Sequence, residues 1–221
     1  MAEDVAPAGP LVHRAVHHAA IVWILAAVEF VVAMIVVQQK YANYSLKANY
    51  ISDLGGKSSP WAIVFDASVI AFGLLVILGV LLITTAFPAR RSRTVGLGLI
   101  AFSGIGSVGV GVFPESFHPA TYHVAFALLA FLAGNLALIV LGAAMFRDTR
   151  WAGYRSYTMF SGLIGLIALI LFVAHLDLAL GTGGMERLIV APMLLWLVVA
   201  GIHLLRVPAY APRILPKSPA A

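Results

Sequence analysis

The sequence predicts an all-α, polytopic integral membrane protein: a bundle of six transmembrane helices with the N and C termini in the cytoplasm. Composition, six long apolar runs and the distribution of positive charge predict this fold. Of the 221 residues, 62% are hydrophobic and only 10% are charged, whereas about 25% of the residues in a soluble domain are charged. So few charges cannot cover a surface in water, and we therefore expect the outer surface to face the lipid bilayer.

Six apolar runs are each long enough to cross about 30 Å of hydrocarbon as a helix that rises about 1.5 Å per residue. The first run is too long for a cleaved signal peptide, so we interpret it as a retained span. The runs cover residues 18–38, 61–87, 95–113, 121–146, 157–180 and 188–205. This division predicts a disordered cytoplasmic tail over residues 1–16, a transmembrane domain over residues 17–206 and a Pro-rich cytoplasmic tail over residues 207–221.

The positive charges predict the orientation, because lysine and arginine concentrate in the cytoplasmic connections of membrane proteins. The side predicted to be cytoplasmic holds ten of the 14 lysines and arginines: Arg14, Arg90, Arg91, Arg93, Arg147, Arg150, Arg155, Arg206, Arg213 and Lys217. The connection 39–60 then lies on the non-cytoplasmic face of a multi-pass protein of the plasma membrane. The net charge of +5 comes mostly from residues beside apolar runs, so it indicates topology and excludes nucleic acid as a partner.

Polar residues on the non-cytoplasmic side form the candidate site. Ionisable groups cost about 2.5–3.5 kcal/mol each at the centre of a bilayer, so their presence in or near spans calls for a reason. We predict that they line one outward-facing pocket. The candidate catalytic residues are Asp53, Glu115, His118, His123, His175 and Glu186, and the candidate substrate-binding residues are Asn49, Tyr50, Ser52, Asp66 and Arg187.

Two chemistries fit these residue types. Histidines and carboxylates can bind a divalent metal such as zinc, whose bound water becomes a nucleophile near neutral pH. No H-E-x-x-H motif is present, and the five-residue step from His118 to His123 does not place both rings on one helix face. The candidate ligands for a metal are His118, His123, His175 and Asp66. Without a metal, a histidine and a carboxylate can act as general base and acid on a lipid-linked ester or phosphate. The absence of cysteine excludes disulfides and thiol catalysis.

Each candidate also has a structural interpretation. Asp53 can stabilise a turn in its own loop, Asp66 can pair with Arg187 or with a histidine, and Glu186 can form a local ion pair with Arg187. Both interpretations stay open for these residues at the level of sequence.

Glu29, near the middle of the first span, has two interpretations of its own. A carboxylate at this depth suits an ion or proton pathway. Alternatively it is protonated and hydrogen-bonded to a neighbouring helix, through Asn135 or Ser107.

Small residues and prolines predict how the helices pack. Ser103, Ser107 and Gly111 recur every four residues in the third run, a spacing that lets helix backbones approach closely. We therefore expect this run to be the central, protein-buried helix. Pro60, Pro119 and Pro192 are expected near the starts of the helices that return from the non-cytoplasmic side, where a missing N–H costs little.

Several motifs identify a related family. They are NYISDLG (residues 49–55), GVFPE (111–115) and GMER (184–187), with Tyr44-Ser45, Ser59-Pro60, His118-Pro119, His123 and Trp196. In this combination the chain resembles, over about residues 17–206, the bacterial and archaeal membrane family labelled domain of unknown function 998. The resemblance implies a helical membrane protein whose biochemical activity is not established, and it favours treating the outer motifs as one site.

The leading functional hypothesis is therefore a pocket on the non-cytoplasmic face that binds, and can chemically process, a lipid or lipid-linked headgroup. Asp53, Glu115 and Glu186 would place or polarise the headgroup, and the histidines would exchange protons. One alternative is a small ion-coupled carrier that uses Glu29 and Asp66. The other is a non-catalytic membrane scaffold or a subunit of a larger complex.

Overall fold

The computed structural model describes residues 10–83, 91–146 and 149–206, and it confirms a polytopic all-α bundle. Six of the helices are long and apolar enough to cross a membrane, and the described ranges contain no strand. The predicted tail 207–221 and the first nine residues of the predicted tail 1–16 lie outside the described residues. The elements are α1 (Pro10–Lys40), η1 (Ser52–Gly55), α2 (Ala62–Ile83), α3 (Arg91–Val112), α4 (Thr121–Met145), η2 (Thr149–Trp151), α5 (Arg155–Val173) and α6 (Gly181–Leu204).

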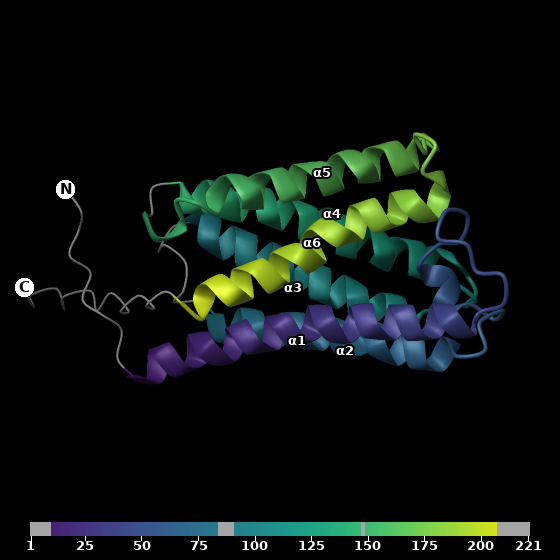
Figure 1. Ribbon diagram of the computed structural model, residues 1–221, viewed down its shortest axis with the longest axis horizontal. Helices are drawn as coiled ribbons and strands as arrows, with labels where there is room; N and C mark the ends of the chain where they lie inside the picture. Colours follow the sequence, from purple (N-terminus) through teal and green to yellow (C-terminus); the bar gives the residue numbers. More distant parts are fainter. Residues whose placement is uncertain (1–9, 84–90, 147–148, 207–221) are drawn as a thin grey trace, which may run out of the picture.

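The six long helices run side by side along the long axis of the molecule (Figure 1), and their contacts close a ring. Each helix packs against its neighbours in the chain, and α6 returns to pack against α1; α6 also contacts α4 across the ring. The α1–α2, α3–α4 and α5–α6 connections therefore meet at one end of the bundle, called the loop end below. Pro10 and Leu204 lie at the opposite end, called the terminal end.

Close backbone contacts hold neighbouring helices together. A Cβ atom on Gly73 of α2 would lie 2.4 Å from the carbonyl oxygen of Gly104 on α3, so only glycine allows this approach. Ser103, Ser107 and Gly111 are buried, as their spacing predicts. The prediction that α3 is the central helix is wrong, because α3 forms one wall of the ring and α6 makes the contact across it.

Buried tryptophans fill the bundle between α1 and α6. The rings of Trp23 and Trp196 are 5.3 Å apart and fully buried. Trp23 donates its indole N–H to the carbonyl oxygen of Val76 at 3.2 Å, and Trp196 donates to the Thr158 hydroxyl at 3.0 Å. Both polar atoms are thus satisfied in a region without water.

Three helix boundaries differ from the predicted ones by seven or eight residues. α1 begins at Pro10, α5 ends at Val173 and α6 begins at Gly181, so the third connection at the loop end covers residues 174–180. Pro192 is consequently inside α6, and the prediction that it lies near a helix start is wrong. The glycine-rich stretch before residue 188 suggests a loop by propensity, but packing against the α1–α2 connection stabilises it as helix.

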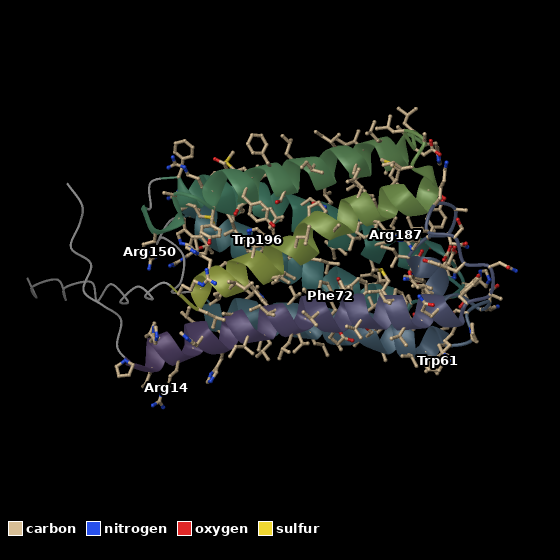
Figure 2. The ribbon with its side chains drawn as sticks, viewed as in Figure 1. Arg14, Trp61, Phe72, Arg150, Arg187 and Trp196 are labelled. Atoms are coloured by element: carbon tan, nitrogen blue, oxygen red, sulfur yellow. The ribbon has the colours of Figure 1, made fainter. Side chains whose placement is uncertain are left out.

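The two ends of the bundle carry different residues (Figure 2). Arg14 and Arg150 lie at the terminal end, and Trp61 and Arg187 lie at the loop end. Lys40, where α1 ends, places its Nζ 5.5 Å from the centre of the Trp61 ring. Tryptophan and lysine are typical of the membrane–water interface, so this pair marks the headgroup level at the loop end. That the terminal end faces the cytoplasm stays a prediction.

Candidate functional site

The α1–α2 connection has an ordered interior that its own side chains build. The Asn49 amide oxygen accepts the Ser45 N–H at 3.0 Å, and the Asn49 amide nitrogen donates to the Asp53 carboxylate at 2.8 Å. Asp53 also accepts the Tyr50 N–H at 2.9 Å. Asn49 and Asp53 therefore fix the loop conformation, in the manner of Asx turns.

The same connection is attached to the start of α6 through Arg187. Its Nη1 donates to the carbonyl oxygens of Leu46 (3.1 Å), Asn49 (3.1 Å) and Gly183 (2.8 Å). Its Nη2 donates to the Tyr44 hydroxyl at 2.7 Å. The guanidinium group thus donates to three backbone carbonyl oxygens and to the Tyr44 hydroxyl. We call this contact between residues 44–49 and 181–187 the latch.

Glycines make the latch a backbone-to-backbone contact. A Cβ atom on Gly183 would lie 2.0 Å from the carbonyl oxygen of Asn49, and one on Gly181, which has φ +74°, would lie 2.3 Å from that of Lys47. The Gly183 N–H donates to Lys47 O at 3.0 Å, and the Thr182 hydroxyl donates to Ala48 O at 2.8 Å. No other residue type permits this approach at position 183.

The Tyr44 hydroxyl joins Arg187 to the backbone of the first connection. It accepts from Arg187 and donates to the carbonyl oxygen of Tyr50 at 2.8 Å. Burial raises the pKa of Tyr44 above its ordinary value, although the charge of Arg187 lowers it. The hydroxyl therefore stays neutral and keeps its proton for the bond to Tyr50.

A polar recess of about 230 Å³, the surface pocket, lies between the first two connections of the loop end. It draws together three of the predicted catalytic residues: Asp53 from the first connection, with Glu115 and His118 from the second. The full lining is Tyr41, Asp53, Gly56, Lys57, Ser58, Glu115, Ser116 and His118. Both signs of charge and several hydroxyl groups thus face one space.

Glu115 is the most perturbed acid of this pocket. Burial raises the pKa of Glu115, and the neighbouring Asp53 raises it further by charge repulsion and by hydrogen bonding; the Ser52 side chain opposes these effects through its own hydrogen bond. Two carboxyl groups this close resist ionising together, so the pair retains a proton to higher pH than an isolated glutamate does. One oxygen of Glu115 is buried without a hydrogen-bond partner.

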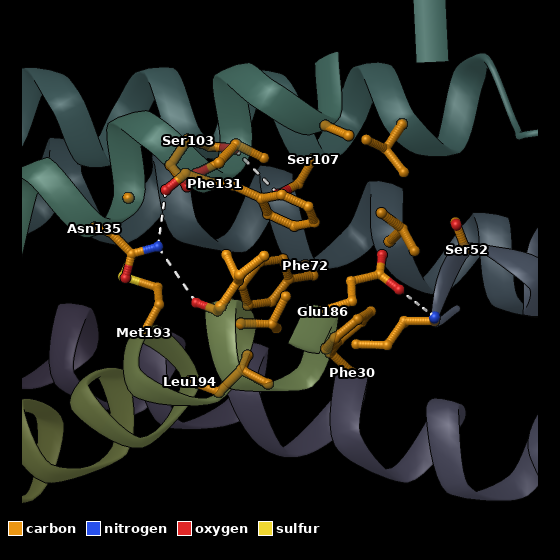
Figure 3. A pocket seen from close by; sticks show the side chains of 18 of the residues that line it. Phe30, Ser52, Phe72, Ser103, Ser107, Phe131, Asn135, Glu186, Met193 and Leu194 are labelled. Carbon is orange, nitrogen blue, oxygen red and sulfur yellow. Dashed lines mark hydrogen bonds between the residues drawn. The ribbon is translucent and has the colours of Figure 1, made fainter. Parts of the chain in front are cut away.

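A second space, the buried cavity, lies deeper in the bundle and measures about 90 Å³ (Figure 3). Ile51 and Ser52 line it from the first connection, while Asp53 next to them lines the surface pocket. Glu186 and His123, two further predicted catalytic residues, line the cavity and not the pocket. One oxygen of the Glu186 carboxyl group accepts the Ile51 N–H, and His123 Nδ1 donates to the carbonyl oxygen of Phe113 at 2.9 Å.

The remaining candidates lie elsewhere. Asp66, in the second turn of α2, packs under Gly55, where a Cβ atom would lie 2.1 Å from its Oδ1. His175 is exposed in the α5–α6 connection. Asp66 and His175 line neither the surface pocket nor the buried cavity. The predicted residues therefore divide among these two spaces, the first connection with its latch, and these two positions.

The predicted metal ligands divide in the same way. His118 lies at the surface pocket and His123 at the buried cavity, while His175 and Asp66 are outside both. Among the described residues, no three histidine, aspartate or glutamate side chains are grouped as a metal ion would require.

Glu29 has no partner of the kind that the sequence suggested. Its Oε2 is buried without a hydrogen bond. Asn135 instead donates to Phe131 O at 2.9 Å and to Ile189 O at 3.3 Å, and Ser107 donates to Ser103 O at 3.1 Å. The prediction that Glu29 bonds to Asn135 or Ser107 is therefore wrong.

Sequence reasoning missed several residues of the site. Tyr41, Lys57 and Ser58 line the surface pocket, and Gly183 shapes the latch. The signal for Gly183 was present: three glycines in four residues beside a polar tip indicate a close backbone approach as well as a loop. The position of Lys57 on the pocket lining depends on the meeting of the first two connections. The spacing of residues along the chain does not reveal that contact.

Comparison with known proteins gives one match. The model of a family described as "Protein of unknown function (DUF998)" matches residues 24–203, which span all six membrane helices and both spaces. No curated protein and no solved structure matches the chain.

Proposed function

The chain belongs to the DUF998 family of proteins of unknown function, and we propose that it binds a lipid or lipid-linked headgroup in the surface pocket, on the non-cytoplasmic face. The observation that carries the proposal is the meeting of Asp53, Glu115 and His118, from two different connections, in one polar recess. The wall residue Tyr41 directly follows Lys40 in the chain, and Lys40 contacts Trp61. These interfacial residues support a position of the recess at headgroup depth.

The charges of the pocket favour a headgroup that carries an amine and a phosphate. Asp53 and Glu115 offer carboxyl oxygens to an ammonium group, and the unpartnered oxygen of Glu115 is already buried. Lys57, on the same lining, supplies a positive charge for a phosphate. Phosphatidylethanolamine has both groups and is the reference ligand for this proposal.

The pocket also has groups suited to acid–base chemistry. The raised pKa of Glu115 keeps a proton available at higher pH, and His118 on the same lining carries imidazole nitrogens that can accept or donate a proton. General catalysis on a headgroup ester or phosphate needs such a pair within reach of the bound group. Processing of the headgroup is thus a second outcome that the same pocket supports, and it requires the binding step first.

The carrier alternative has less support. Glu29 and Asp66, which it requires, line neither of the two spaces. Towards the terminal end, the buried indole rings of Trp23 and Trp196 pack together between α1 and α6. A carrier needs a polar route through the bundle, and these two buried indole rings occupy the space between α1 and α6.

Lipid binding by the protein in nanodiscs tests the proposal. Nanodiscs that contain equal amounts of phosphatidylethanolamine and phosphatidylglycerol are analysed by native mass spectrometry, which counts the lipids retained on the protein. We expect retention of phosphatidylethanolamine to exceed that of phosphatidylglycerol about tenfold, and headgroup products in the same samples would reveal processing. Equal retention of the two lipids would contradict the proposal.

Two pairs of variants connect retention to the pocket. Lys57→Ala and Glu115→Gln should each reduce the preference about fivefold, because each removes one charge from the lining. Lys47→Ala and Asp177→Asn are the matched controls, since Lys47 and Asp177 are exposed at the same end and outside the lining. Loss of the preference in the controls would mean that the charge of the whole loop end, not the pocket, selects the lipid.

A further inference from the structure

The buried cavity carries an inference that does not depend on the surface pocket. Its lining comes from α1, α2, α3, α4 and α6 and from the first connection. Figure 3 shows side chains of the lining converging from the surrounding helices and from the first connection. Its volume of about 90 Å³ suits a stretch of one hydrocarbon chain and not the paired chains of a diacyl lipid.

Most of the cavity wall offers no hydrogen bond to a ligand. Phe30, Phe65, Phe72 and Phe131 contribute aromatic surface. The hydroxyl groups on the wall are already engaged: Ser103 donates to the carbonyl oxygen of Ala130 at 2.8 Å, and Ser107 donates to that of Ser103. Asn135 donates its amide nitrogen to two backbone carbonyls. Its amide oxygen has no hydrogen-bond partner and lies against Gly165 of α5, where a Cβ atom would lie 1.8 Å from it. Over most of its length the space therefore accommodates hydrocarbon.

The end of the cavity nearest the latch is different, because a carboxyl group faces it. Glu186 is only 6% exposed. One of its oxygens accepts the Ile51 N–H, and the other points away from Ile51 into the cavity (Figure 3). His123, which is 8% exposed, lines the same space with Nδ1 committed to Phe113. A ligand group that hydrogen-bonds to this oxygen therefore gains affinity over an apolar group of the same size.

We propose that the buried cavity binds a single hydrocarbon chain that ends in a hydroxyl group, with the hydroxyl at Glu186 and the chain along the phenylalanine-lined wall. A hydroxyl group both donates and accepts, so it pairs with the carboxyl group in either protonation state. An alkane fills the same wall but leaves the Glu186 oxygen unpaired. Long-chain alcohols, including isoprenoid alcohols, are the chemical class that meets both conditions.

Photo-crosslinking of the protein in nanodiscs tests this inference. The probes are a C12 alcohol with a mid-chain diazirine and the matching alkane without the hydroxyl group, and labelled peptides are mapped by mass spectrometry. We expect the alcohol to label residues on the cavity lining, such as Val69 and Val190, about fivefold more than the alkane does, as one net hydrogen bond predicts. Labelling confined to the lipid-facing surface, or equal labelling by both probes, would overturn the proposal.

Variants on one helix locate the binding. Ala127 lines the cavity and Ala125 is exposed on the outside of α4, so Ala127→Phe should abolish interior labelling by filling the space and Ala125→Phe should leave it unchanged. Melting temperatures check that both variants fold. If Ala127→Phe does not fold, the comparison of the alcohol with the alkane on the unmodified chain decides whether the cavity binds the alcohol. Retained interior labelling in a folded Ala127→Phe protein would contradict the assignment.

The outcome is separable from that of the lipid-headgroup proposal. Ala127 is not on the surface-pocket lining, so Ala127→Phe should not alter the preference for phosphatidylethanolamine. Lys57→Ala, conversely, should leave labelling by the alcohol unchanged, because Lys57 lines only the pocket. A loss of both properties in either variant would mean that the two spaces form one site.

Discussion

The two halves of α6 are held by contacts of different kinds. Towards the terminal end, Gly201 packs against α1, where a Cβ atom would lie 2.6 Å from Ile24 Cγ1 and 2.9 Å from the carbonyl oxygen of Ala20. Towards the loop end, Gly183 packs more closely still, with a Cβ position 2.0 Å from the carbonyl oxygen of Asn49 in a connection. Both contacts use glycine to bring backbones together; one partner is a helix and the other a loop.

This difference determines what each half can do. A contact between two helices in a membrane is part of the bundle itself, and losing it separates two spans. The latch instead depends on the Arg187 guanidinium group and the Tyr44 hydroxyl, so it can open while the helices stay packed. Regions with such low local stability are where proteins place binding elements, and both the surface pocket and the buried cavity border this connection.

Gly201→Ala should have the largest effect on global stability. The added methyl group meets the α1 backbone, and overpacking of this kind costs about 1–3 kcal/mol, with larger values where backbone must move. The melting temperature of the reconstituted protein measures the loss. Gly98→Ala is the control, because nothing lies within 4 Å of a Cβ atom at that position, and it should be neutral or gain up to about 1 kcal/mol. A Gly201→Ala protein as stable as the control would remove the distinction between the two halves of α6.

Gly183→Ala should produce a smaller global effect and a large local one. The new methyl group would lie 2.0 Å from Asn49 O, so the connection must leave α6 and expose the Ile51 N–H that Glu186 now accepts. Hydrogen–deuterium exchange should become at least tenfold faster at Ile51 and the loop amides, while the melting temperature falls by less than in Gly201→Ala. Global unfolding without a preceding local opening would show that the latch is an integral part of the bundle.

The membrane fold could be predicted from the sequence because apolar length and charge placement are local properties. Six runs long enough to span hydrocarbon are visible in any window of about 20 residues. The start of α6 at Gly181 could not be predicted in the same way, since glycine lowers helix propensity. It is helical because the loop backbone packs against Gly181 and Gly183, and that contact joins segments more than 130 residues apart.

The candidate site was predicted in residue type and only partly in arrangement. Depth along the helices suggested one pocket, but depth does not reveal direction around the ring. The residues expected to line the pocket were Asp53, Asp66, Glu115, His118, His123, His175 and Glu186. In the structure, His118 lines the surface pocket and His123 lines the buried cavity. Arg187, predicted to bind substrate, instead makes four hydrogen bonds within the latch. Its guanidinium donors are therefore directed at protein groups.

Glu115→Gln should have the smallest effect, one that appears only as a dependence on pH. The folded protein raises the pKa of Glu115 through burial and the nearby Asp53. A carboxyl group with a raised pKa contributes its stabilisation fully below the ordinary glutamate range, and that contribution is lost as the pH rises through the folded pKa. Glutamine resembles the protonated form and does not ionise, so the variant should match the unmodified protein near pH 4 and become slightly more stable than it at pH 8.

Melting temperatures between pH 4 and pH 9 measure this difference, with Asp177→Asn in the exposed α5–α6 connection as the matched control. The size is small because Glu115 is half-buried and water screens its interactions. A bound ammonium group favours the ionised carboxyl pair. Phosphatidylethanolamine should therefore reduce the difference in melting temperature between Glu115→Gln and the unmodified protein, called the gap, at pH 8, whereas phosphatidylglycerol should not. A gap that is the same at every pH would mean that Glu115 and Asp53 do not share a proton, and the loop end would then differ from the terminal end in packing alone.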